Sequence, residues 1–85
     1  MPNSLFTDAH KDLVALLVAA RQRANLTQTE LAALIGKDQK FISLIERGQR
    51  RVDVLEFYVL AKALSLDPVK FYSALVKRLP DKIDI

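Results

Sequence analysis

The chain has 85 residues, 51% of them hydrophobic, which suffices for one domain with a modest core, near the size at which oligomerisation adds stability. It has no cysteine and one histidine, which excludes disulfides, thiolate chemistry and the usual histidine-rich metal sites and fits a reducing cytoplasm. The net charge is only +3. The segment from Lys37 to Arg51 has five basic and two acidic residues, so its excess of positive charge equals that of the whole chain.

A helix that supplies core residues is predicted after a frayed lead-in over residues 1–6. Thr7 or Asp8 can cap its start. The apolar run over residues 13–20 is too short to cross a bilayer and follows acidic rather than basic residues, so neither a membrane span nor a signal peptide is expected. Apolar residues at helical spacing define the core face: Phe6, Ala9, Leu13, Leu16, Leu17, Ala20 and Ala24.

Three residues border this face without belonging to it. Val14 and Val18 are either exposed or covered by a partner. His10 is interpreted as a surface or core-edge histidine rather than a metal ligand or a catalytic base.

The middle of the chain has the pattern of two short helices joined by a tight turn. Thr27 and Glu30 form a capping box, so a helix is predicted to begin at Gln28. Asp38 caps a second helix that begins at Gln39 and extends to about residue 47. The apolar stripe of the first helix consists of Leu31, Leu34 and Ile35. The two helices are ended by the chain's two glycines, which adopt a left-handed backbone most easily: Gly36 and Gly48.

The second of these helices has two chemically different faces. Phe41, Ile42, Ile45 and Glu46 fall on one side. The other side carries amide, ammonium, hydroxyl and guanidinium groups, which pair with base edges and phosphates on a helix that fits the major groove. This side is interpreted as facing DNA, the alternative being an ordinary solvated face. Its residues are Gln39, Lys40, Ser43, Leu44 and Arg47.

The segments LTQTELAALIG and QKFISLIERGQRR resemble the helix-turn-helix of the XRE family, which includes the phage repressor and Cro class of small transcriptional regulators. The resemblance extends from about Arg21 to Phe71, with the helix-turn-helix at residues 27–48. It implies an all-α, lambda-repressor-like domain of five helices, which docks its third helix in the major groove and binds symmetric operators as a dimer.

The resemblance also implies roles for individual residues. Gln28 is expected to contact a phosphate at the start of its helix, and Arg47 is expected to lie near the DNA backbone. The residues expected to face bases are Gln39, Lys40, Ser43 and Leu44. Among side chains of these types, Gln suits adenine, Lys suits guanine and Leu can meet a thymine methyl group.

Arg21 and Glu46 are predicted to form an ion pair. Arg21 lies at the edge of the first apolar face, and Glu46 lies on the buried side of the second helix of the helix-turn-helix. A buried carboxylate is costly unless it is paired, so each residue suggests the other as its partner. The XRE resemblance implies the same pair, and the alternative is two separate solvated charges.

The segment after Gly48 is predicted to be a loop followed by a helix. Arg50 and Arg51 are interpreted as phosphate contacts, with plain solvation as the alternative. Asp53 and Glu56 form a second capping box, which opens a helix that extends to about residue 64. The core residues predicted for this helix are Leu55, Val59, Leu60 and Leu64, with Tyr58 exposed.

A last helix is predicted from Pro68 to about residue 79, with Asp67 as its cap and a mobile tail over residues 81–85. It has more apolar surface than one core needs, since a second group of residues widens the stripe beyond Phe71, Leu75 and Leu79. We interpret this second group as a homodimer contact, and the alternative is a wide core face. Its members are Val69, Tyr72 and Val76.

Together these features predict one all-α domain that binds double-stranded DNA sequence-specifically and regulates transcription, as a repressor-like homodimer on a palindromic operator. The competing prediction is an antitoxin-like or adaptor protein that holds a protein partner with its last helix. No catalytic residue, metal, cofactor, membrane contact or small-molecule substrate is expected, because the sequence has no paired nucleophile and base, phosphate-binding glycine loop or set of metal ligands.

Overall fold

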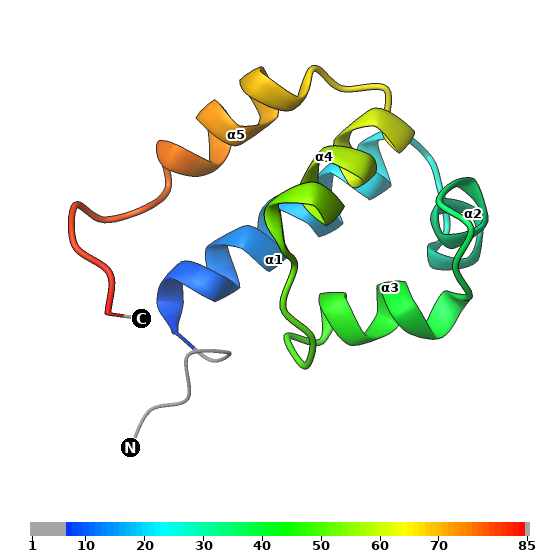
Figure 1. Cartoon of the computed structure of the whole chain (residues 1–85), viewed down its shortest axis with the longest axis horizontal. Coiled ribbons are helices and arrows are strands. Elements are labelled where there is room, and N and C mark those ends of the chain that lie inside the picture. The colour runs from blue at the N-terminus through cyan, green and yellow to red at the C-terminus, as the bar shows by residue number, and fades with distance from the viewer. Residues whose placement is uncertain (1–6, 85) are drawn as a thin grey trace.

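The computed structural model describes residues 7–84, which contain five α-helices and no strand (Figure 1). The all-α, five-helix prediction is therefore confirmed. Predictions for residues 1–6, including Phe6 as a core residue, and for Ile85 lie outside the described residues. None of the helices in residues 7–84 is long and apolar enough to cross a membrane. The helices are α1 (Asp8–Arg23), α2 (Gln28–Leu34), α3 (Gln39–Glu46), α4 (Val54–Ala63) and α5 (Pro68–Val76).

Polar side chains cap the start of every helix, as the sequence predicts. In the capping box of α2, Thr27 Oγ1 accepts from the Glu30 amide at 3.0 Å, and Glu30 Oε1 accepts from the Thr27 amide at 2.8 Å. The capping box of α4 has the same two bonds between Asp53 and Glu56, at 2.7 and 3.0 Å. Of the two candidates for α1, the cap is Thr7, whose side chain accepts from the His10 amide. These bonds satisfy amides that the first turn of a helix leaves unpaired.

Four helices end in the same way, with one residue in a left-handed conformation. The residue beyond it donates its amide back to a carbonyl five positions earlier, as in the bonds from Lys37 to Ala32 and from Leu66 to Ala61, both 2.9 Å. Two of the left-handed residues are the predicted glycines, and the other two carry side chains. Their φ angles are 59° at Asn25, 72° at Gly36, 73° at Gly48 and 60° at Ser65.

The end of α5 differs from the prediction. The helix stops at Val76, not near residue 79, because the chain tightens into a turn with bonds from Arg78 to Leu75 at 2.9 Å and from Leu79 to Val76 at 3.1 Å. Leu79 nevertheless packs against the core, as its place in the predicted stripe requires.

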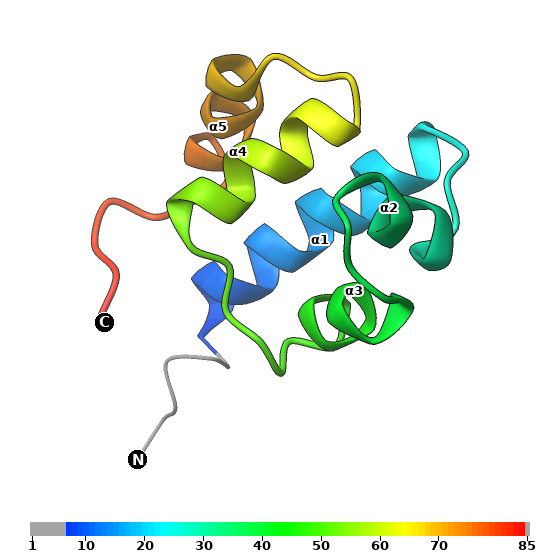
Figure 2. The same ribbon diagram turned by 45° about the vertical axis from the view of Figure 1, so that its right-hand side comes forward.

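The core lies around α1, which runs between α5 and the α2–α3 pair in both views of the ribbon (Figures 1 and 2). All five helices contribute buried apolar residues, so the interior is continuous. Val14 and Val18, whose state the sequence left open, are half-buried in α1. The core consists of Leu16, Leu17, Ala20, Leu31, Ala32, Ile42, Ile45, Phe57, Leu60, Ala61, Leu64, Phe71 and Leu75.

The predicted core face of α4 is partly wrong. Leu55 and Val59 are 73% and 43% exposed, whereas Phe57 and Ala61 take the buried positions beside Leu60. The sequence VLEFYVLAKA is apolar almost all round, so apolar spacing does not select one face. The face is selected by α5, because the Phe57 ring stacks on the Phe71 ring with centroids 5.0 Å apart. Leu34 of α2 is also 60% exposed, although the sequence placed it on the apolar stripe.

Candidate nucleic-acid interface

The exposed face of α3 carries the residues that the sequence assigned to DNA. Ile42 and Ile45 are each only 2% exposed and fix this helix against the core. The polar residues therefore project on the opposite side, where Gln39, Lys40 and Arg47 are exposed and Ser43 and Leu44 are half-buried. The structure thus brings these five residues together on one helix face, and their contact with DNA stays a prediction.

Arg21 and Glu46 form an ion pair between α1 and the end of α3. Arg21 Nε donates to Glu46 Oε2 at 2.6 Å, and Nη2 donates to Oε1 at 3.0 Å. The two side chains are only 14% and 9% exposed, and the hydrogen bond to Glu46 raises the pKa of Arg21. Arg21 Nη1 also donates to the carbonyl oxygen of Leu26 at 2.8 Å, which holds the end of α1 to the start of the helix-turn-helix.

The ion pair continues into a chain of amide hydrogen bonds that reaches the predicted DNA face. Gln28 Nε2 donates to Glu46 Oε1 at 2.8 Å, and Gln28 Oε1 accepts from Gln39 Nε2 at 2.6 Å. Gln28, predicted as a phosphate contact, is the first residue of α2. Its side chain therefore joins the start of α2 to Gln39, the first residue of α3. The sequence analysis missed this link, since it assigned both Gln28 and Gln39 to DNA and did not predict a hydrogen bond between them.

Arg50, also predicted as a phosphate contact, has several partners within the protein. Its Nη1 and Nη2 atoms donate to the two carboxylate oxygens of Glu56 at 2.9 and 2.8 Å, and Nη1 also donates to the carbonyl of Arg51 at 2.7 Å. The guanidinium carbon lies 4.5 Å from the centre of the Phe41 ring. Hydrogen bonding between the two side chains raises the pKa of Arg50 and is the main cause of the lowered pKa of Glu56. Arg50 thus joins the loop to α3 and α4, a role the sequence analysis missed.

Arg51 lies on the other side of that loop, near the start of α1. It is exposed and borders a hollow of about 170 Å³ together with His10 and Leu79. Burial, and then the positive charge of Arg51, lowers the pKa of His10. His10 Nε2 is buried and has no hydrogen-bond partner among residues 7–84, which favours the neutral ring. A phosphate contact by Arg51 stays a prediction.

This arrangement of helices matches a known family. Residues 17–71, more than half of the chain, match the family model described as helix-turn-helix. The chain belongs to the XRE family of helix-turn-helix transcriptional regulators. The resemblance that the sequence analysis proposed is thereby confirmed, and with it the assignment to DNA-binding proteins that regulate transcription.

Several relatives of this XRE-family chain are known. An uncharacterized HTH-type transcriptional regulator, y4dJ of Sinorhizobium fredii, is 40% identical over 50 residues, which are 59% of this chain. The matched region spans 65% of the length of that relative. An XRE-family like protein from Pseudomonas syringae pv. tomato has a similar structure, with a TM-score of 0.78 and 39% identity over 85% of this chain and 88% of that one.

Two restriction-modification controller proteins also have similar structures. C.AhdI from Aeromonas hydrophila is 35% identical, with a TM-score of 0.64 over 76% of this chain and 99% of its own. C.Esp1396I is 25% identical, with a TM-score of 0.75 over 84% of this chain and 93% of its own, in a structure of its tetramer with a natural 35 base-pair operator.

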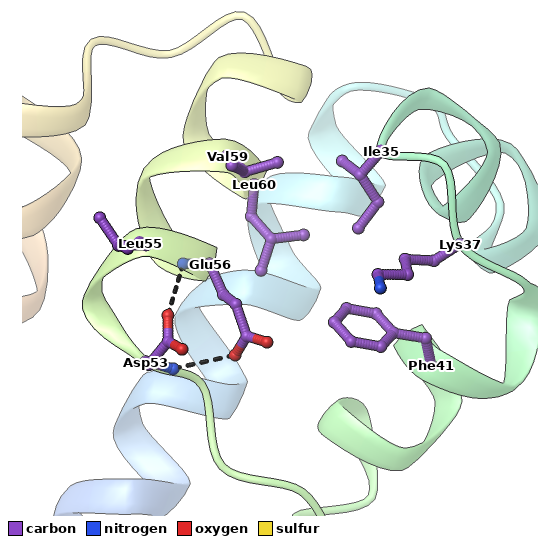
Figure 3. Close-up of a pocket in the computed structure, with 8 residues that line it drawn as sticks. All are labelled: Ile35, Lys37, Phe41, Asp53, Leu55, Glu56, Val59 and Leu60. Atoms are coloured by element: carbon purple, nitrogen blue, oxygen red, sulfur yellow. Dashed lines mark hydrogen bonds between the residues drawn. The ribbon is translucent and has the colours of Figure 1, made fainter.

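A hollow of about 290 Å³ lies between the turn of the helix-turn-helix and α4 in this XRE-family domain (Figure 3). Phe41 and Lys37 line one side, and the Lys37 ammonium nitrogen lies 5.4 Å from the centre of the Phe41 ring. Leu55 and Val59, the two exposed residues of α4, line the other side, where Glu56 is already bonded to the α4 cap. Across residues 7–84 no group of three or more His, Cys, Asp or Glu side chains could hold a metal ion.

One side of α5 carries exposed apolar side chains. Tyr72 is 54% exposed, and its ring meets the Phe57 ring edge-on with centroids 6.1 Å apart. Val69 and Val76 lie on the same face of α5, and Tyr58 of α4 is exposed, as the sequence predicted. We name the surface formed by Val69, Tyr72 and Val76 the apolar face.

Proposed function

We propose that this chain binds double-stranded DNA sequence-specifically as a homodimer, on a palindromic operator, and represses transcription there in the cytoplasm. The observation that carries this proposal is the polar, exposed face of α3, on a helix whose other side is fixed by Ile42 and Ile45. A short helix held in this way can enter the major groove as a rigid unit, which base recognition requires.

The proposed contacts divide into two classes. The base-facing residues are Gln39, Lys40, Ser43 and Leu44, because their side chains lie on the exposed or half-exposed side of α3. The phosphate contacts are Gln28, Arg47, Arg50 and Arg51. Within the second class Arg47 is the principal contact, since it is exposed at the end of α3, whereas the Arg50 guanidinium already binds Glu56.

The apolar face supports the homodimer. Val69, Tyr72 and Val76 are 76%, 54% and 48% exposed, and covering three such side chains by a second copy removes apolar surface from water. A symmetric dimer uses the same surface on both subunits and presents two α3 helices to two half-sites. The operator-bound tetramer of C.Esp1396I is a precedent for oligomeric binding within this fold.

The test is to select bound sequences from random DNA duplexes. We expect an enriched palindrome whose half-site centres lie about 34 Å apart, one turn of DNA. Selection of a lone half-site would contradict the homodimer, and no enrichment over the starting pool would contradict sequence-specific binding.

Gln39→Ala on the selected operator tests whether α3 faces the bases. The variant should bind the operator about 1–3 kcal/mol more weakly and lose preference at one base pair of each half-site, while its binding to a scrambled duplex changes little. Gln22→Ala, a matched change on the exposed surface of α1, should leave both affinities unchanged. An equal loss on both duplexes would show that Gln39 does not contact a base.

The apolar face also favours a second candidate function, an antitoxin-like or adaptor protein that uses α5 to hold a different protein. If that candidate is right, the isolated chain should be a monomer. Substitutions in α3 should then leave its biological activity intact. A dimeric chain with an enriched palindrome would exclude it as the main function.

A further inference from the structure

The hydrogen bonds that join Arg21, Glu46, Gln28 and Gln39 have a fixed direction. A carboxylate held by an arginine has acceptor atoms only, so the group of Gln28 that faces Glu46 must be the NH2 group. The carbonyl oxygen of Gln28 then faces Gln39, which must turn its own NH2 group toward Gln28. Both amide orientations therefore follow from the chemistry of Glu46.

We propose that Glu46 is a positioning residue, which acts through Gln28 to set the atoms that Gln39 presents to a DNA base. This inference rests on the proposed function, in which Gln39 faces a base. Glu46 itself is only 9% exposed at its side chain and belongs to the largely buried ion pair, so its effect on specificity is indirect.

The orientation matters because a glutamine amide alone does not distinguish adenine from guanine. The terminal torsion of a glutamine is soft, so the NH2 group and the carbonyl oxygen exchange places at little cost. A freely turning amide can present two N–H donors to the N7 and O6 acceptors of guanine, or one donor and one acceptor to adenine. Both bases are then accommodated.

The bond to Gln28 removes this freedom. One N–H of Gln39 is already donated at 2.6 Å, which leaves one N–H and the carbonyl oxygen for the base. This pair matches N7 and the N6 amino group of adenine. Against guanine the same carbonyl oxygen would face the O6 acceptor, so the oriented amide selects adenine and rejects guanine.

Gln28→Met tests the inference. Methionine keeps the unbranched length of glutamine but removes the strong hydrogen-bonding groups, so Gln39 is released. The measurement is the ratio of affinities for adenine and guanine at the base pair whose preference Gln39→Ala abolishes. We expect a ratio of about tenfold or more in the wild type, and of about two- to threefold in Gln28→Met. The ratios at other base pairs should not change.

Glu46→Gln provides an independent variant that lies outside the predicted DNA face. Its carboxamide can present either an acceptor or a donor to Gln28, so both orientations of the two amides become available and the adenine-to-guanine ratio should fall. Glu30→Gln is the matched control, because Glu30 is also a carboxylate of the helix-turn-helix, but its side chain bonds to the Thr27 amide alone among residues 7–84. It should keep the wild-type ratio. A folded Glu46→Gln variant that keeps the wild-type ratio would overturn the role of Glu46, even if Gln28→Met lowers that ratio. If Glu46→Gln does not fold, Gln28→Met decides, because it removes the amide that Glu46 orients.

The outcomes separate this inference from the function on which it rests. If Gln39→Ala abolishes the preference at one base pair but Gln28→Met keeps the wild-type ratio there, the positioning role is wrong and the proposed function stands. A uniform loss of affinity in Gln28→Met, with the ratio intact, has the same meaning, since it reports only a lost phosphate contact. If Gln39→Ala leaves every base preference unchanged, both the positioning role and the proposed role of Gln39 are overturned.

Discussion

The Glu46 carboxylate at the end of α3 accepts two hydrogen bonds from Arg21 of α1, at 2.6 and 3.0 Å, and a third from Gln28 of α2, at 2.8 Å. One side chain therefore connects the helix that forms the centre of the core with both helices of the helix-turn-helix. Together with the buried Ile42 and Ile45, this carboxylate therefore fixes the position of the proposed DNA surface relative to the core.

A double-mutant cycle should show that Arg21 and Glu46 are coupled. Each single change to Ala leaves a largely buried charge without its partner, so each should lower the free energy of unfolding by about 3 kcal/mol, and the double variant should lose much less than the sum. Urea unfolding measures all four proteins. Arg23→Ala, on the exposed side of α1, should cost less than about 0.5 kcal/mol. Additive losses would mean that the pair contributes no shared energy.

Tyr72→Glu should convert the dimer to a monomer, because it places a charge in the middle of the apolar face, where a second copy would have to desolvate it. Sedimentation velocity gives the mass of both proteins. Lys70→Gln, on α5 but outside the apolar face, changes the formal charge by the same amount and should leave the dimer intact. A dimeric Tyr72→Glu variant would place the contact on another surface.

Arg47→Ala and Arg51→Ala should weaken binding to operator and scrambled DNA by similar factors. Each variant should also lower the slope of log affinity against log salt concentration by about one unit, because one fewer phosphate is neutralised. Arg78→Ala removes the same charge beyond α5 and should leave the slope unchanged. Unchanged slopes in the first two variants would exclude them as phosphate contacts.

His10 should make the fold less stable in mildly acidic solution. Its folded-state pKa is lowered from 6.5 by burial and by the charge of Arg51. In mildly acidic solution the unfolded chain therefore binds a proton at His10 more readily than the folded protein does. The contribution of neutral His10 to the free energy of unfolding is therefore present above pH 6.5 and is lost as the pH falls through the lowered pKa. Between about pH 8 and about pH 5, the wild type should lose more free energy of unfolding than His10→Leu. Parallel losses would show that His10 titrates normally in the fold.

The local signals in the sequence predicted most of the fold. Capping boxes and glycines depend on residues three or four positions apart, so Thr27, Glu30, Gly36 and Gly48 were sufficient to bound the helix-turn-helix. The end of α5 was less well defined, because a tightened turn keeps Leu79 near the core without continuing the helix.

Contacts between distant segments were harder to predict. The core face of α4 was misjudged at Leu55 and Val59, since a helix that is apolar all round takes its orientation from its neighbours. The bonds of Arg50 to Glu56 and of Gln28 to Gln39 depend on how the loop and the helices meet. Arginine and glutamine beside a DNA-binding helix suit DNA and internal partners equally well, so composition alone does not separate the two.

The left-handed residues at the helix ends have a consequence for how this domain can evolve. Asn25 after α1 and Ser65 after α4 have φ angles of 59° and 60°, which residues with a side chain disfavour. At the same position α2 and α3 are followed by glycine, which adopts such angles easily. Ser65→Gly should therefore raise the free energy of unfolding by about 1 kcal/mol and the melting temperature by roughly 4–8 °C, measurable by calorimetry. Neither residue lies on α3, so such changes would supply mutational tolerance, which lets a lineage accept destabilising substitutions at Gln39 or Lys40 while it acquires a new operator.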